Sequence, residues 1–204
     1  MRRPLLLAVA LLASACAGQQ KPMAAAPGSE APTAPALPAP GAAGAGEALA
    51  EYDLNHDGKA DVWKYSVTDA AGKERVTRRE KDLNNDGKLD SWEAYAPDGT
   101  LAKLVYDMDF DARADVTLLF EKDQLVRKEY AFGFDGIPHS FNFYEKGKLV
   151  RKERDTNGDG RVDTWEYWEN GQIDRIGTDV DADGVVDKWE ARRTAQAGEA
   201  APQK

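Results

Sequence analysis

Short apolar segments alternate with short polar segments along residues 50–193, at regular intervals. After each polar cluster comes a segment in which two aromatic rings stand two positions apart, and residues two apart share one face of a strand. The pairs are Trp63/Tyr65, Phe141/Phe143 and Trp165/Tyr167. A turn sequence such as Asn170-Gly171 then follows, which favours a tight β-hairpin. The pattern predicts an all-β fold, an antiparallel β-meander of hairpin repeats.

The polar clusters are copies of one motif. The clearest copy begins at Asp155 and the next begins at Asp179, an offset of 179 − 155 = 24 residues. Each copy carries Asp or Asn at positions 1, 3 and 5, Gly at position 6 and Asp at position 9. About six such units of ~24 residues fill the domain, and internal repeats of this length favour a stacked architecture.

The copies differ in completeness. Those at 82–93, 155–166 and 179–190 end in a glutamate at position 12. The copy at Asp53 has Lys64 in place of that glutamate, and the copy at Asp107 has Ala112 for the glycine and Leu118 for the glutamate. A sixth, degenerate copy contains Asp135-Gly136. Four of the five tryptophans occupy one motif position, and Phe141 occupies it in the degenerate copy; they are Trp63, Trp92, Trp165 and Trp189.

This motif resembles the calcium loop of EF-hand proteins. Ca²⁺ takes six to eight oxygen ligands, and the glycine permits the sharp bend. The resemblance implies side-chain ligands at positions 1, 3, 5, 9 and 12 and a backbone carbonyl at position 7, with Ca²⁺ as the ion. The expected ligands are Asp53, Asn55, Asp57, Lys59, Asp61, Asp82, Asn84, Asp86, Lys88, Asp90, Glu93, Asp107, Asp109, Asp111, Asp115, Asp155, Asn157, Asp159, Arg161, Asp163, Glu166, Asp179, Asp181, Asp183, Val185, Asp187 and Glu190. The degenerate copy is expected to bind nothing.

EF-hand helices do not fit between the copies. Only 178 − 166 = 12 residues separate Glu166 from Asp179, and they contain a hairpin turn. The hairpin half also resembles MORN-type repeats, through its aromatic segments and Asn-Gly turn. A small β-propeller and an EF-hand-type α fold are the alternatives. The segments before the loops are rich in Lys, Arg and Glu, so one face of the sheet is expected to be wet, and the aromatic stripe is either core or a ligand-binding surface.

The first fifty residues differ in composition. Arg2 and Arg3 precede an apolar run, as in a signal peptide covering 1–15, and the run is too short to span a bilayer. Cys16, the only cysteine, stands where the lipobox of bacterial lipoproteins places its acylated residue, although Ala13 replaces the usual branched residue. The resemblance implies a lipid such as palmitate on Cys16 and, from Ala17, the outer membrane. Residues 16–49 are Ala-, Pro- and Gly-rich and predict a disordered tether, with a second disordered tail at 194–204.

The charge and the residue types narrow the function. A formal charge of −9 argues against nucleic acid as a partner. We expect a calcium-binding, lipid-anchored structural or interaction protein of the cell envelope, periplasmic or surface-exposed, without catalysis of its own. Its partners would be the membrane, through the lipid, and an envelope protein or glycan. The alternatives are a carbohydrate-binding or glycan-active protein and an EF-hand-type sensor. Only two histidines, His56 and His139, are available, and both fall in loops.

Overall fold

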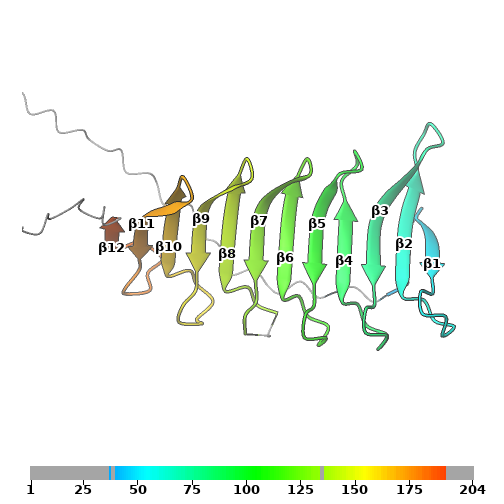
Figure 1. Ribbon diagram of the computed structural model, residues 1–204, viewed down its shortest axis with the longest axis horizontal. Helices are drawn as coiled ribbons and strands as arrows, with labels where there is room; N and C mark the ends of the chain where they lie inside the picture. Colours follow the sequence, from blue (N-terminus) through cyan, green and yellow to red (C-terminus); the bar gives the residue numbers. More distant parts are fainter. Residues whose placement is uncertain (1–36, 38–39, 134–135, 192–204) are drawn as a thin grey trace, which may run out of the picture.

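The computed structural model describes residues 37, 40–133 and 136–191. Twelve strands form one antiparallel sheet in which every strand lies beside its neighbours in sequence (Figure 1). This confirms the predicted all-β meander. The described residues contain no helix and the sheet is open, so neither the EF-hand nor the propeller alternative holds. Cys16, Asp135 and the tail after residue 193 lie outside the described residues.

The strands are four to eight residues long, and each is bounded by a turn or a loop. They are β1 (Ala48–Tyr52), β2 (Val62–Thr68), β3 (Glu74–Lys81), β4 (Ser91–Tyr95), β5 (Leu101–Tyr106), β6 (Val116–Glu121), β7 (Gln124–Tyr130), β8 (Ser140–Glu145), β9 (Lys148–Arg154), β10 (Thr164–Glu169), β11 (Gln172–Thr178) and β12 (Lys188–Ala191).

The meander has two long edges, formed by the ends of the strands, and the connections at these two edges differ. Tight turns at one edge join β2 to β3 and each later hairpin pair, and the longer loops all lie at the other edge (Figure 1). The long loops span residues 53–61, 82–90, 107–115, 131–139, 155–163 and 179–187. Every expected metal-binding copy therefore begins at the first residue of a long loop, and the whole set is collected along one edge.

The pairing register is the same in every hairpin. The residue that follows one long loop always pairs with the residue that precedes the next. The pairs are Val62↔Lys81, Ser91↔Tyr106, Val116↔Tyr130, Ser140↔Arg154 and Thr164↔Thr178. Each hairpin also contains one register shift nearer its turn, as between Tyr65 and Ser66. Each repeat of the sequence motif thus corresponds to a repeat of the same strand-pairing register.

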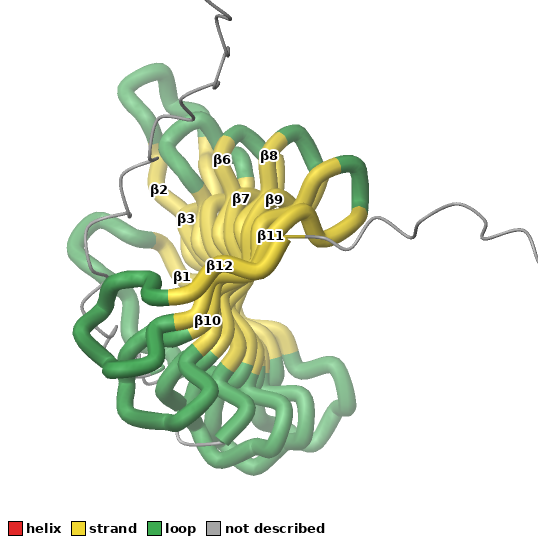
Figure 2. Tube along the Cα trace, turned by 90° about the vertical axis from the view of Figure 1, so that its left-hand side faces the viewer, coloured by secondary structure: helices red, strands yellow, loops and turns green. Residues whose placement is uncertain are grey.

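The strands form a single layer, which the view along the stacking direction shows clearly (Figure 2). One face, called the aromatic face here, carries two rows of directly paired residues. The first row is Glu51, Trp63, Glu80, Trp92, Val105, Thr117, Glu129, Phe141, Glu153, Trp165, Gly177 and Trp189. The second row is Leu49, Tyr65, Arg78, Ala94, Lys103, Leu119, Arg127, Phe143, Arg151, Tyr167, Arg175 and Ala191.

Charged residues of the strands that enter the long loops lie on both faces of the sheet, not only on the more exposed face opposite the aromatic one. Arg127 and Arg151 lie on the aromatic face, where the guanidinium of Arg151 stands 4.2 Å from the ring centroid of Phe143. Glu80 and Glu153 lie on the same face and are 0% and 7% exposed. Stacking of planar cations on rings is favourable when both are partly desolvated, which explains how charged residues fill a thin core.

The N-terminal strap, residues 40–47, lies on the aromatic face over β2 and β3. The N–H of Gly41 donates to Glu80 Oε2 at 3.4 Å, Arg78 donates to the carbonyl of Ala42, and Thr77 donates to Glu47 Oε1 at 2.6 Å. These contacts bury Tyr65 completely. Ordered contacts therefore begin before residue 50, inside the segment expected to be tether. The described residues include no helix long and apolar enough to cross a membrane.

Candidate functional site

The first carboxylate of each long loop organises the backbone that follows it. In the 82–90 loop, Oδ1 of Asp82 accepts from the N–H of Asn85 at 2.7 Å, and Oδ2 accepts from the N–H of Gly87 at 2.8 Å. The aspartates that begin four other loops accept from the same two positions: Asp53, Asp107, Asp155 and Asp179. An aspartate at position 1 thus folds the loop around its own carboxylate.

Positions 3 and 5 continue the turn. Asn84 Oδ1 accepts from the N–H of Asp86, and Asp86 Oδ1 accepts from the N–H of Lys88, both at 2.9 Å. Position 6 has a positive φ, +88° at Gly87 and +71° at Ala112, where a side chain is strained. Short oxygen-bearing side chains and a glycine are therefore what this backbone requires, with or without an ion.

Four of the five position 9 carboxylates are buried, as are four of the five at position 1; Asp187 and Asp53 are the exposed ones. Asp90 is 1% exposed, and its Oδ2 accepts from the N–H groups of Leu83 and Asn84. Its Oδ1 is buried and makes no hydrogen bond within the described residues, and the same is true of Asp115 Oδ1. Buried carboxylate oxygens are normally paired, so two unpaired ones among other carboxylates indicate a missing cationic or hydrogen-bonding partner.

Two loops bring three carboxylates close enough to share a metal ion. In each group the oxygens lie within 4.8 Å of one another, and the groups are Asp107, Asp109, Asp115 and Asp179, Asp181, Asp187. Both loops have Asp at position 3, whereas the loops that begin at Asp53, Asp82 and Asp155 have Asn there, so an amide oxygen takes the place of the third carboxylate. The 107–115 loop belongs to this pair although it lacks the glycine of the intact motif. These acidic triads could hold a metal ion.

Mutual repulsion is visible in these triads. The carboxylates of Asp183 and Asp187 raise the pKa of Asp181. Desolvation and the carboxylates of Asp111 and Asp107 raise the pKa of Asp109. A cation would relieve such repulsion, because an opposite charge nearby favours the ionised form.

The position 12 glutamates lie in strands rather than in the loops that hold the other carboxylates. Glu93 lies in β4, where Lys81 Nζ and Tyr95 O–H donate to it at 2.6 and 2.5 Å. Glu166 lies in β10 and accepts from Arg154 and Trp168, and Glu190 lies in β12 beside Lys188. Each glutamate faces the side of the sheet opposite the aromatic face, paired with other side chains. The core of the site thus consists of positions 1, 3, 5 and 9.

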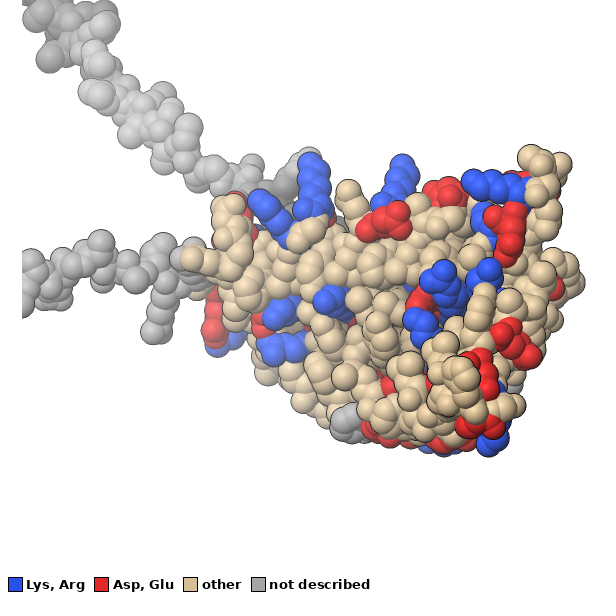
Figure 3. All heavy atoms as spheres, turned by 45° about the vertical axis from the view of Figure 1, so that its right-hand side comes forward, with Lys and Arg blue, Asp and Glu red and all other residues tan. Residues whose placement is uncertain are grey.

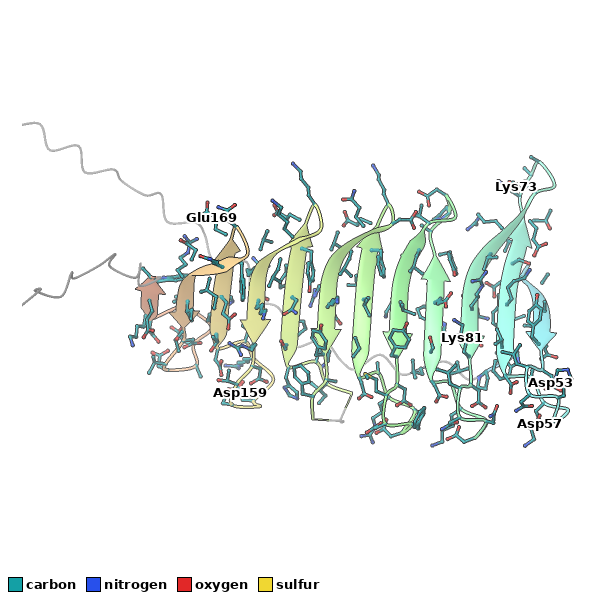
Figure 4. The ribbon with its side chains drawn as sticks, viewed as in Figure 1. Asp53, Asp57, Lys73, Lys81, Asp159 and Glu169 are labelled. Carbon is teal, nitrogen blue, oxygen red and sulfur yellow. The ribbon has the colours of Figure 1, made fainter. Side chains whose placement is uncertain are left out.

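Backbone hydrogen bonds connect each long loop to the next. The N–H of Asp82 donates to the carbonyl of Asp61, and the N–H of Asp107 donates to that of Asp90, both at 2.9 Å. The degenerate 131–139 loop belongs to the same chain of contacts, because Asp155 N–H donates to the carbonyl of His139 at 2.9 Å. His139 Nδ1 also lies 3.1 Å from Asp155 Oδ2. Acidic side chains gather at the lower edge of the face in Figure 3, with others elsewhere on that face among Lys and Arg. Asp53, Asp57 and Asp159 lie at the loop edge, with Lys73 and Glu169 at the opposite edge (Figure 4).

Sequence reasoning overlooked the apolar residue at position 8. Leu89 is 2% exposed and forms a small core with Trp63 and Tyr65, against which Ala60 packs. This residue closes the loop over the start of the aromatic face, next to the buried carboxylate at position 9. The signal was present, because position 8 carries an apolar residue in every copy: Ala60, Leu89, Ala114, Pro138, Val162 and Val186.

The fold and the loops define a class: a single-layer antiparallel repeat sheet with a carboxylate-lined edge. No protein-family model matches the chain, and no curated protein matches it. Solved structures similar to it include a GtfA/B complex (15% identity, TM-score 0.34, 58% of this chain and 20% of that one) and accessory secretory protein 1,2 and 3 of Streptococcus pneumoniae (12%, 0.33, 62% and 20%). A third is S. aureus TarM in complex with fondaparinux, alpha-GlcNAc-glycerol and UDP (12%, 0.31, 61% and 20%). The chain spans about a fifth of each of these chains, and TM-scores this low define neither a fold family nor an activity.

Proposed function

We propose that this protein is a calcium-binding, lipid-anchored structural or interaction module of the bacterial cell envelope, without catalysis of its own. The observation that carries the proposal is the buried Oδ1 of Asp90 and of Asp115, each unpaired within the described residues and each in a loop of carboxylates. An oxygen-rich loop of this kind suits a hard cation.

Calcium is favoured over magnesium by the donor set. The loops offer carboxylate and amide oxygens from alternating positions, and Lys88 and Arg161 follow these in sequence at position 7 of their loops. Ca²⁺ accepts many protein oxygens in flexible geometry, whereas Mg²⁺ demands an octahedron and retains water. Extracellular calcium modules have dissociation constants of about 10⁻⁴–10⁻³ M, so millimolar Ca²⁺ would stabilise the fold by about 1 kcal/mol per filled loop.

The ion's role in this proposal is to join neighbouring strands. Each long loop connects two paired strands, and it is bonded through its backbone to the next loop. When Ca²⁺ neutralises the carboxylates of one long loop, it therefore stabilises the loop ends of both strands that the loop connects. An extended sheet on a lipid at Cys16 would present its faces to an envelope protein or a glycan.

Calcium titration of the full chain tests the proposal. The chain carrying Cys16→Ser avoids acylation and is followed by calorimetry and by thermal unfolding in millimolar Ca²⁺, in Mg²⁺ and in chelator. We expect several bound Ca²⁺ ions and a large rise in Tm with Ca²⁺ and little with Mg²⁺. Identical melting curves in Ca²⁺ and in chelator would refute calcium binding.

The anchor is tested separately. Cells expressing the wild-type chain and the Cys16→Ser variant are labelled with a palmitate analogue and fractionated. The label and the membrane association should both disappear in the variant. Retention of the label would show that Cys16 is not the acylated residue.

A further inference from the structure

Both ends of the sheet expose a strand edge. No strand of the described residues pairs with the outer edge of β1 or of β12. Large apolar side chains are exposed on both strands: Leu49 at 37%, Tyr52 at 44% and Trp189 at 50%. The N-terminal strap makes its hydrogen bonds to β3 rather than to β1. Open edges of this kind pair readily with another strand unless charges, prolines or bulges prevent it. Neither β1 nor β12 contains a proline or a bulge, and their charged residues are Glu51, Lys188 and Glu190.

The repeat determines which strand would fit. The sheet begins with a strand that enters a long loop, and it ends with a strand that leaves one. In all five hairpins, a strand leaving a loop pairs antiparallel with the next strand entering one. Within the described residues, β12 is thus the first half of a hairpin without its second half, and β1 is the second half of a hairpin without its first half.

Applying the common register to these halves gives a definite set of pairs. Residue 188 follows a loop and residue 52 precedes one, so Lys188 would face Tyr52 of the partner subunit. Continuing along the strands, Trp189 would face Glu51 of the partner subunit, Glu190 would face Ala50 of the partner subunit, and Ala191 would face Leu49 of the partner subunit.

The pair of Trp189 with Glu51 matches aromatic–glutamate pairs of the interior. Glu80 is paired on one side with Trp63 and on the other with Trp92, and Glu153 is paired with Phe141 and Trp165. Both glutamates are buried. Glu51 has the first of these neighbours, since Trp63 Nε1 donates to its Oε1 at 3.2 Å, but it is exposed on its other side. Trp189 of a second copy would complete the same aromatic–glutamate–aromatic arrangement.

We propose that a second copy of this chain docks β12 against β1, extending the sheet end to end. The contact is heterologous, so each dimer still exposes one free β1 and one free β12 and further copies can add. The two aromatic faces become continuous, and so do the loop-bearing edges, because the 179–187 loop comes to lie beside the 53–61 loop of the partner subunit. The product is a ribbon of strands with a regular row of carboxylate loops.

Cysteine cross-linking tests the register. Within one chain β1 and β12 are separated by eleven strand spacings, roughly 50 Å, so a disulfide between them must join two molecules. In the full chain carrying Cys16→Ser, in calcium buffer, Leu49→Cys with Ala191→Cys should give dimers and higher oligomers under mild oxidation. The control, Ala50→Cys with Ala191→Cys, places the thiols on opposite faces and should give few. Equal cross-linking of both pairs, or none in either, would overturn the proposal.

A charge pair at the same junction provides a second test. Ala50→Glu places a carboxylate opposite Glu190 of the next copy, although it also gains Lys64 as a neighbour within its own chain. Ala50→Lys reverses both effects. Like charges directly opposite destabilise a strand pair, so sedimentation velocity should show weaker self-association for Ala50→Glu and stronger for Ala50→Lys, with monomer stability changing in the opposite order. Self-association that is absent, or that both substitutions shift in one direction, would show that a second copy does not occupy this edge.

Discussion

The hydroxyl of Tyr65 donates a 2.7 Å hydrogen bond to Oε2 of Glu80, and neither side chain is exposed to solvent. Arg78 completes the group, since its guanidinium stands 3.7 Å from the centroid of the Tyr65 ring and its Nη1 lies 3.2 Å from Glu80 Oε1. Burial and the Glu80 carboxylate together raise the pKa of Tyr65. A carboxylate is thus held in the core by one hydroxyl, one stacked cation and the backbone N–H of Gly41.

Glu80→Gln should destabilise the sheet more than Tyr65→Phe. The first change breaks the buried ion pair between Glu80 and Arg78, and Arg78 then keeps only Glu47, at 3.2 Å, as a carboxylate partner among the described residues. Breaking such a pair costs up to about 3–5 kcal/mol. The second change removes one hydrogen bond to a charged group, about 1.5–3 kcal/mol. Urea unfolding of both variants and of the double variant measures the difference. If Glu80→Gln proves the milder of the two, the ion pair contributes little and the packing of the strap dominates.

Ala112→Gly should stabilise the protein by about 1 kcal/mol, because Ala112 has a φ of +71° at the position where other loops have glycine. The matched reverse change is Gly87→Ala, at a φ of +88° with nothing within 4 Å of the added Cβ. It should lower the free energy of unfolding by about 1–2 kcal/mol through backbone strain alone. Shifts of the same sign in thermal melts of the two variants would contradict this explanation.

Asp90→Asn separates the two roles of a buried loop carboxylate. The amide oxygen can still accept from Leu83 and Asn84, but the variant offers no negative charge to a cation. We expect the rise in Tm on adding Ca²⁺ to shrink while the Tm in chelator is unchanged or slightly higher. Asp98→Asn is the control, because Asp98 lies in a turn at the opposite edge and accepts from Thr100. An equal loss of the calcium response in both variants would show that Asp90 is not a ligand.

Gly177→Ala should weaken β12 selectively. A Cβ at this position would lie 2.9 Å from Trp189 Cζ3 and 2.9 Å from Val186 Cγ1, so the terminal strand must move. The expected cost is about 1–3 kcal/mol. Hydrogen exchange should accelerate in β12 and the 179–187 loop, with β2 and β3 unchanged. Uniform acceleration across the sheet would mean that the strands unfold as one cooperative unit.

Much of the candidate site could be predicted from the spacing of a few residue types. Asp155 and Asp179 stand 24 residues apart and begin loops of the same structure. The reason is local, because the carboxylate at position 1 accepts hydrogen bonds from backbone N–H groups three and five residues later in the chain. The grouping of loops along one edge follows equally from alternating turns and loops. Glu93 could not be placed in this way, because the strand rather than the motif determines its direction, and in the sheet it finds Lys81 and Tyr95.

The sequence by itself determined the repeat, the strand order and the local form of each acidic bend, because these depend on contacts between residues close in the chain. Only the tertiary structure decided that Arg151 and Glu153 share a face with Phe143 and Trp165. It also decided that the N-terminal strap covers Tyr65, and that no strand of the described residues pairs with the outer sides of β1 and β12. The physical reason is pairing across strands: register and bulges select which residues become neighbours, and charged groups move into a thin core when their neighbours are rings and opposite charges.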